Sequence, residues 1–238
     1  MIIAIASQKG GTGKTTSVVN IGACLSKLNK SVLLIDLDPQ ANLTQSLGIE
    51  QELTIEELLT GKAKLEEVIT QVENFDVIPC NTYFNETAIG NAMLLTNALK
   101  SVYEYDYILI DCPPHLGILT LNALIAADKL FTTIKCDYLS LLSIVKLEDL
   151  ITEIKQHNPG LELSGIIPTF YFSNTLLSRD TLKRLKDRYK DKVFDPVRIN
   201  VSLAEAPISH RPVINYAPGS HGAKDYMKIA KQIIKRIK

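Results

Sequence analysis

Short apolar segments alternate along the chain with longer segments in which apolar residues recur every three or four positions. The short segments are rich in β-branched residues and predict strands over 2–6, 32–36, 75–78, 107–111, 129–134 and 165–169. The helical spacing predicts helices over 14–28, 54–60, 86–103, 119–127, 143–156, 176–192 and 222–238. Most of these strands are apolar on both faces, as in a parallel sheet that is covered on both sides. The alternation therefore predicts an α/β fold with a doubly wound, mostly parallel sheet and helices on both of its faces.

The last two predicted helices each have one apolar face. Residues 176–192 place Leu182, Leu185 and Tyr189 on that face of an otherwise basic helix, and residues 222–238 place an isoleucine-rich stripe opposite several lysines. No linker rich in Pro, Gly or Ser, no internal repeat and no low-complexity tract interrupts the sequence. We therefore expect one domain over residues 1–238.

The overall charge balance hides an asymmetry between two parts of the chain. Lys and Arg total 26, and Asp and Glu also total 26, so the formal net charge is zero. Residues 1–178 contain 11 basic and 20 acidic side chains, whereas residues 179–238 contain 15 basic and 6 acidic ones. Such an asymmetry indicates a surface that faces a polyanion. We expect this surface to lie in the basic portion, at 176–238.

Cysteine content and hydropathy indicate the compartment. No CxxC spacing relates the four cysteines, which are Cys24, Cys80, Cys112 and Cys136. In a chain of this length they cannot form a disulfide framework, which favours a reducing environment. The first residues show no basic leader or cleavage signal, and no apolar stretch reaches the ~18–20 residues of a membrane span. We expect a cytoplasmic protein without stable membrane association.

A glycine-rich segment follows the first predicted strand and precedes the first predicted helix. It reads Gln8-Lys9-Gly10-Gly11-Thr12-Gly13-Lys14-Thr15-Thr16. Glycines let backbone N–H groups turn inward and the helix N-terminus adds the positive end of its dipole, so a polyphosphate fits there. In this pattern Lys14 reaches the β- and γ-phosphates and the Thr15 hydroxyl binds Mg²⁺. A standard P-loop has glycine where Gln8 stands, and here a second lysine, Lys9, follows instead.

The segment KGGTGKTT resembles the deviant Walker A motif of the ParA/MinD/nitrogenase iron protein class of P-loop ATPases. The resemblance implies a P-loop NTPase fold, ATP and Mg²⁺ as cofactors, and a homodimer with ATP sandwiched between the subunits. It also implies that Lys9 reaches the phosphates bound to the partner subunit, where a second cation stabilises transition-state charge as an arginine finger does. The nucleotide-binding residues expected are Lys9, Gly10, Gly11, Thr12, Gly13, Lys14, Thr15, Thr16 and Pro168.

Two apolar strands each end in an aspartate. VLLIDLDPQ over 32–40 and YILIDCPP over 107–114 deliver Asp36 and Asp111 to the carboxyl edge of the sheet, where ligands bind in open α/β folds. Both segments resemble motifs of the same class, the second being its Walker B strand. The resemblance assigns Asp36 and Asp111, together with Thr15, to Mg²⁺.

Two further polar residues follow these strands. The resemblance assigns Asp38 to positioning the attacking water, although Asp38 could instead cap a helix that begins at Pro39. His115 stands where the class usually has serine, and either a general base or an exposed loop histidine is compatible with that position. The expected catalytic residues are Lys9, Lys14 and Asp38.

Further segments resemble the ParA/Soj partition ATPases over nearly the whole chain. IKCDY over 134–138 resembles the VQCEY segment of that family, and LAEAP over 203–207 resembles its LSEAP segment. The resemblance implies plasmid or chromosome partition by a slow ATPase that a ParB-like centromere-binding protein stimulates together with DNA. Two arginines of the family's IPRNVR segment are replaced by Ile199 and Ser202, which leaves open whether Arg198 takes over their contact with DNA.

The basic portion supplies candidate contacts to DNA phosphates. Scattered lysines and arginines bind DNA without reading its sequence, so we expect non-specific binding to double-stranded DNA and association with the nucleoid. The expected contact residues are Lys183, Arg184, Lys186, Arg188, Arg198 and Arg211.

Three other functions are compatible with parts of this pattern. In a MinD-like ATPase the C-terminal amphipathic helix would lie on an anionic membrane, although it lacks bulky Phe or Trp anchors. In an iron–sulfur protein Cys112 and Cys136 would converge on a cluster, although both positions suit small buried hydrophobic residues. A small-molecule kinase would require an acceptor site that no segment of the sequence indicates.

Overall fold

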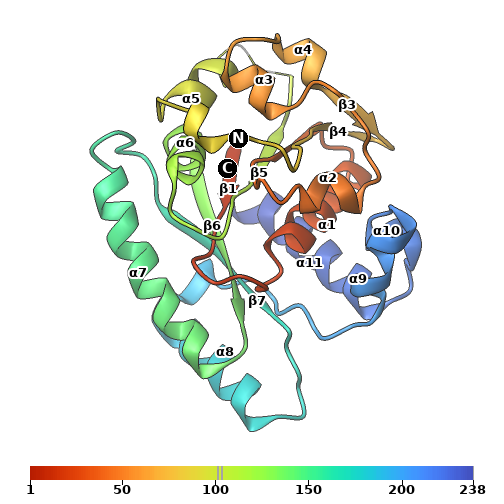
Figure 1. The fold of residues 1–238 in the computed structure, drawn as a ribbon. Helices are drawn as coiled ribbons and strands as arrows, with labels where there is room; N and C mark the ends of the chain where they lie inside the picture. The colour runs from red at the N-terminus through yellow and green to blue at the C-terminus, as the bar shows by residue number, and fades with distance from the viewer. Residues whose placement is uncertain (101, 103, 238) are drawn as a thin grey trace.

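The computed structural model describes residues 1–100, 102 and 104–237. Its centre is a seven-stranded sheet in the order β3-β4-β2-β5-β1-β6-β7 (Figure 1). The described pairings are parallel, except that of β3 with β4. The strands are β1 (Ile2–Ile5), β2 (Val32–Asp36), β3 (Thr70–Val72), β4 (Phe75–Ile78), β5 (Tyr107–Asp111), β6 (Lys129–Lys135) and β7 (Leu163–Thr169). The predicted doubly wound, mostly parallel sheet is confirmed.

Alternate side chains of the strands point into two separate hydrophobic layers. Ile3 and Ile5 of β1 face one layer, whereas Ala4 faces the other. The first layer is covered by α1 (Lys14–Lys27), α2 (Asn42–Ser46), α10 (Val213–Tyr216) and α11 (His221–Arg236). The second is covered by α3 (Ile55–Leu59), α4 (Leu65–Val68), α5 (Leu94–Leu99), α6 (Ile118–Ala126), α7 (Tyr138–Ile154) and α8 (Leu176–Tyr189). Helices on both faces explain why the strands are apolar throughout.

Short helical turns complete the chain. They are η1 (Glu86–Ala88), η2 (Lys190–Lys192), α9 (Ser202–Glu205) and η3 (Ala206–Ser209). In Figure 1, α7 runs alongside β6 and β7 with α8 below it, whereas α9 and α10 lie on the other side of the molecule. The predicted basic helix is therefore α8 followed by η2, and it packs through Leu185, which is 1% exposed, and the half-buried Leu182 and Tyr189.

The helix predicted over 86–103 is wrong. The structure has η1, a loop and α5 in its place, and residues 101 and 103 lie outside the described residues. Asn91 shapes the loop, because its side chain accepts a hydrogen bond from the backbone N–H of Met93 and its carbonyl accepts one from the side chain of Asn122. Asn122 also accepts a hydrogen bond from the backbone N–H of Leu95 at the start of α5. These contacts with α6 supply the hydrogen bonds that a continuous helix would have made internally.

The last helix packs into the core. Tyr226, Ile229 and Ile233 of α11 are at most 1% exposed, and the Tyr226 hydroxyl lies 3.0 Å from the Ser17 hydroxyl of α1. The apolar stripe that the MinD-like alternative would place on a membrane is thus buried against α1 and the sheet. Residue 238, the end of the predicted helix, lies outside the described residues. None of the described helices combines the length and hydropathy needed to cross a membrane.

We predict that Ile233→Ala lowers the free energy of unfolding by about 2–5 kcal/mol, because it leaves a cavity between α11 and the sheet. For a chain of this size this corresponds to a decrease in melting temperature of about 5–15 °C. The control is Lys231→Ala on the exposed face of the same helix, which should change stability by less than about 0.5 kcal/mol. Equal melting temperatures for wild type and Ile233→Ala would contradict the core role of α11.

Candidate nucleotide-binding site

The glycine-rich segment forms a loop between β1 and the N-terminus of α1. Gly11 and Gly13 have φ of 69° and 84°, the left-handed region that other residues enter at a cost. α1 begins at Lys14 directly after Gly13, and its first turn contains no acidic residue. The free N–H groups of this turn and the positive end of the helix dipole therefore face the loop, as an anion site requires.

A cavity of about 420 Å³ opens beside this loop. One wall consists of the loop and the first turn of α1, including Gly10, Gly11, Lys14 and Thr15. The opposite walls come from Asp38 and its successors and from the segment that contains Pro207 and Arg211. Thr12 of the same loop is 2% exposed and hydrogen-bonds to Thr133. Among the described residues, the cavity is thus lined by one buried cation, Lys14, and by one further residue of each charge, Asp38 and Arg211.

A second cavity of about 430 Å³ shares Gly13, Thr16 and Leu203 with the first. Its remaining lining is mostly apolar and comes from the ends of β7 and α11 and from the segment before α9, with Phe170, Val197, Ile199 and Tyr226 as its larger members. Pro168, which the sequence assigned to the nucleotide, lies one residue before Thr169 in the lining, and its carbonyl accepts a hydrogen bond from the N–H of Val197. A flat apolar group attached to a bound phosphate fits this neighbouring space.

Asp36 and Asp111 lie side by side at the carboxyl ends of β2 and β5, in direct register. Both are fully buried. Asp36 accepts hydrogen bonds from the backbone N–H and the hydroxyl of Thr44 and from the N–H of Asp38. Burial raises the pKa of Asp36 to about 6, and these hydrogen bonds limit the increase.

Asp111 is the unsatisfied member of the pair. Neither of its carboxylate oxygens has a hydrogen-bond partner among the described residues. Burial and then the negative charge of Asp36 raise the pKa of Asp111 to about 8, while the nearby Thr15 hydroxyl and the Lys14 charge lower it in part. A buried carboxylate without donors is costly unless a cation compensates it.

These residues fit a magnesium ion. Mg²⁺ prefers oxygen ligands and is commonly bound through one or two carboxylates together with water and substrate phosphates. The described residues contain no cluster of three or more His, Cys, Asp or Glu side chains suited to a metal. Asp36, Asp111 and the Thr15 hydroxyl would therefore provide only part of the coordination, and phosphates and water the rest.

Asp38 belongs to the cavity wall and does not cap a helix. It is 6% exposed, and its Oδ1 accepts a hydrogen bond from the N–H of Gln40 at 3.0 Å. α2 begins at Asn42 rather than at Pro39, with Ala41 as its N-cap residue. The alternative in which Asp38 caps a helix starting at Pro39 is therefore wrong.

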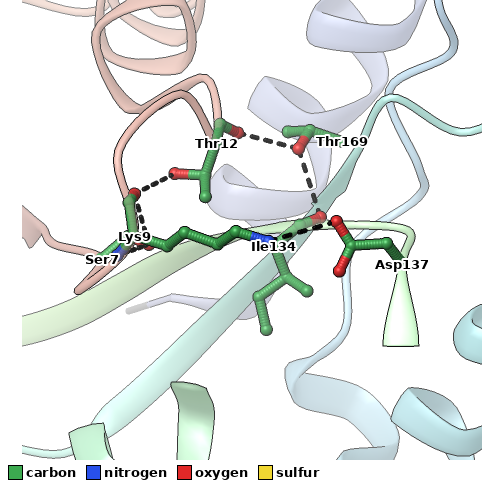
Figure 2. A network of polar contacts seen from close by, with 6 residues as sticks. All are labelled: Ser7, Lys9, Thr12, Ile134, Asp137 and Thr169. Carbon is green, nitrogen blue, oxygen red and sulfur yellow. Dashed lines mark hydrogen bonds and ion pairs between the residues drawn. The ribbon is translucent and has the colours of Figure 1, made fainter. Parts of the chain in front are cut away.

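The two lysines of the loop occupy different environments. Lys14 is 7% exposed and lines the cavity together with Arg211, and these two are the cationic side chains that line it in the described part of the chain. Lys9 extends in another direction, and its Nζ lies 3.4 Å from Oδ2 of Asp137 (Figure 2). Sequence patterns do not indicate the contact between Lys9 and Asp137, because the two residues are distant along the chain and meet only in the fold.

The structure divides the residues expected to contact DNA among three places. Lys183, Arg184, Lys186 and Arg188 lie on α8, where Arg184 pairs with Asp180 and Arg188 pairs with Glu148 of α7. The other two lie elsewhere. The guanidinium of Arg198 donates two hydrogen bonds, of 2.9 and 2.6 Å, to the buried carboxylate of Asp225, and Arg211 lines the phosphate cavity.

Two predicted alternatives involve other residues near the site. His115 Nε2 lies 3.3 Å from Glu86 Oε2 on the exposed surface, which favours its interpretation as a loop histidine. Cys112 and Cys136 are at most 5% exposed and pack in the interior.

Thr44 is a residue that sequence reasoning missed, and it supports Asp36 from α2 with two hydrogen bonds.

We predict that Asp111→Asn raises the melting temperature of the nucleotide-free protein in EDTA at pH 9 by about 3 °C or more, since above the raised pKa of Asp111 the substitution removes a desolvated charge. The matched variant Asp36→Asn should instead lower it, because Asp36 accepts three hydrogen bonds in the same environment. Differential scanning calorimetry measures both. A lower melting temperature for Asp111→Asn would show that its carboxylate is stabilised in the free protein.

Comparison with known proteins places this site in a family. Residues 1–163 match the family model of an AAA domain. The sporulation initiation inhibitor protein Soj of Bacillus subtilis (strain 168) is 40% identical over 246 residues, which cover 98% of this chain and 97% of that protein. The chromosome-partitioning ATPase Soj of Treponema pallidum (strain Nichols) is 38% identical, with coverage of 97% and 95%. The solved structure of the septum site-determining protein MinD from Pyrococcus horikoshii OT3, complexed with Mg-ADP, is 27% identical with a TM-score of 0.84 and coverage of 98% and 96%. The chain therefore belongs to the ParA/Soj family of partition ATPases, as the motifs of its sequence predicted.

Proposed function

We propose that this protein binds Mg-ATP, dimerises around it, binds DNA without sequence preference and uses ATP hydrolysis to switch between states during plasmid or chromosome partition. The observation that carries the proposal is Asp111, a fully buried carboxylate that accepts no hydrogen bond from the described residues and lies beside a phosphate-binding loop. The names of the Soj relatives and the Mg-ADP complex of MinD support the same reading. We place the protein in the cytoplasm, on the nucleoid.

Nucleotide binding follows from the two adjoining cavities. The loop N–H groups and Lys14 hold the β- and γ-phosphates, and the apolar cavity beside Gly13 receives the base. Thr15, Asp36 and Asp111 would hold the magnesium ion. When bound, this ion neutralises phosphate charge and polarises the phosphorus–oxygen bonds.

Hydrolysis needs a positioned water and further positive charge. Asp38 lines the cavity and keeps one oxygen fixed by Gln40, so the carboxylate is oriented to accept a hydrogen bond from a water beside the γ-phosphate. The partner's Lys9 then adds charge stabilisation that one subunit does not supply, which makes hydrolysis depend on dimerisation. Slow basal turnover, stimulated by a ParB-like protein, completes the proposed cycle.

DNA binding is assigned chiefly to α8. Lys183 and Lys186 are exposed, and neither pairs with a carboxylate of the described residues. When exposed, unpaired lysines of this kind contact DNA phosphates, the counterions condensed on the DNA are released. This release favours binding to any DNA sequence. One α8 offers few contacts, but two joined in a dimer bind with higher avidity, so ATP controls DNA affinity through geometry.

We predict that Lys14→Ala weakens ATP binding, that Lys9→Ala binds ATP but no longer dimerises, and that Asp38→Ala binds and dimerises without hydrolysing. The three effects differ because Lys14 contacts the phosphates of its own subunit, Lys9 contacts those of the partner, and Asp38 contacts the attacking water. The measurements are fluorescent nucleotide titration, light scattering with a non-hydrolysable ATP analogue, and phosphate release. Full dimerisation of Lys9→Ala, or unimpaired turnover of Asp38→Ala, would remove the corresponding role.

We predict that the double variant Lys183→Ala/Lys186→Ala weakens binding to all duplex sequences alike. The slope of log K against log salt should become less steep by about 2 to 4, since each lost phosphate contact contributes ~0.9 to it. DNA affinity is measured across a salt series with the ATP analogue and with ADP. The control, Lys27→Ala/Lys62→Ala, removes equal charge from exposed positions away from α8. An unchanged slope in the α8 variant would reject this surface.

A further inference from the structure

Lys9 stands next to the phosphate cavity but is directed away from it. Gly10 and Gly11 line the cavity, whereas Lys9 does not, and its Nζ lies 3.4 Å from Oδ2 of Asp137 after β6. Both side chains are partly exposed, at 41% for Lys9 and 35% for Asp137. Figure 2 shows the lysine extended along the end of the sheet toward this carboxylate.

The carboxylate has a fixed position. The N–H of Asp137 donates to the carbonyl of Lys135 at 2.7 Å, and the preceding N–H, that of Cys136, donates to the carbonyl of Thr169 at 3.0 Å. The Thr169 hydroxyl lies 2.8 Å from the Thr12 carbonyl of the phosphate loop and 3.2 Å from the Ile134 carbonyl. The loop and the ends of β6 and β7 therefore form one polar network, and Asp137 is anchored to it.

Lys9 is the mobile part of this arrangement. Its backbone lies in the network, since its carbonyl is 3.4 Å from the Thr12 hydroxyl, but its four-carbon side chain can rotate about several bonds. A lysine that is to reach another subunit must leave Asp137 first. An ion pair exposed to this degree reduces the population of Lys9 side chains released from Asp137 by a factor of only about 2 to 5. A triphosphate offers a stronger, charge-assisted set of acceptors.

We propose that Asp137 is a positioning residue that acts through Lys9. It holds the lysine on its own subunit while no opposed nucleotide is present, and it releases the lysine when the triphosphate of a second subunit competes for it. This inference rests on the proposed role of Lys9 at the partner's nucleotide. It adds a threshold to dimerisation, because two ion pairs, one in each subunit, must open for one dimer to form.

The expected effect follows from that count. Removing the acceptor should strengthen the dimer by the square of the single-pair factor, or about 4- to 25-fold in its dissociation constant. The affinity of the monomer for nucleotide should not change, because Lys9 does not line its own cavity. In the nucleotide-free protein, the Lys9 amine should also be acetylated about 2- to 5-fold faster.

The experiment compares wild type with Asp137→Asn, Asp137→Ala and Asp137→Glu. Light scattering over a dilution series with Mg²⁺ and a non-hydrolysable ATP analogue gives the dimer constant, and mass spectrometry after acetic anhydride treatment gives the reactivity of Lys9. Asp137→Glu should restore both values toward wild type. The matched control is Glu162→Gln, which breaks the 2.6 Å ion pair with Lys129 at the far end of β6 and should leave both values unchanged.

A second background separates the proposed contact from a general effect of charge. If Asp137 acts only through its field, then Asp137→Ala raises nucleotide affinity in wild type and equally in Lys9→Ala, which overturns the proposal. Unchanged Lys9 reactivity together with an unchanged dimer constant also overturns it. If Lys9→Ala dimerises normally, the trans role under the proposed function fails, whereas faster Lys9 acetylation in Asp137→Asn still demonstrates the intrasubunit contact.

Discussion

The dominant constraint on this molecule is the burial of two carboxylates on adjacent strands. Asp36 and Asp111 lie side by side in register at the carboxyl ends of two central strands, and both are fully buried. The fold compensates one of the two. Thr44 donates twice to Asp36 and accepts a hydrogen bond from the N–H of Cys80, so one threonine fixes α2 against β2 and the end of β4. Asp111 has no such support, which confines the unfavourable free energy to the place where a cation would bind.

The phosphate loop is held on the opposite side of the cavity by neutral contacts. Thr12 and Thr133 share a 2.8 Å hydrogen bond between hydroxyls, and Thr169 approaches the Thr12 carbonyl at the same distance. These threonines join the loop to β6 and β7 without adding charge, so the N–H groups and Lys14 remain available to an anion. A rigid loop also avoids ordering costs when a ligand binds. In the proposed release of Lys9, the part that moves is therefore a side chain rather than the backbone around it.

The parts of the site that could be predicted from sequence are those encoded by neighbouring residues. Two such patterns are an apolar strand that ends in aspartate and a glycine-rich loop before a helix. They specify both which residues form the site and where these residues lie, because the parallel sheet brings strand ends together. The place of Arg211 in the phosphate cavity and of Asp137 beside Lys9 could not be predicted in this way, since the fold brings these residues there from other segments. The helix predicted over 86–103 failed for the same reason, because the Asn91 carbonyl accepts a hydrogen bond from Asn122 of α6 while the Asn91 side chain accepts one from the N–H of Met93.

The basic portion shows that a count of charges does not by itself identify a binding surface. Arginines in it are largely committed to internal partners. Arg198 holds the buried Asp225, Arg188 reaches Glu148, and Arg236 donates to the carbonyls of Asp191 and Val193. The planar guanidinium, with several fixed donors, suits such contacts, whereas the strongly hydrated ammonium of lysine favours exposure. The excess of positive charge at this end of the chain therefore has two origins, with arginines fastening loops and helices together and the lysines of α8 remaining exposed to solvent.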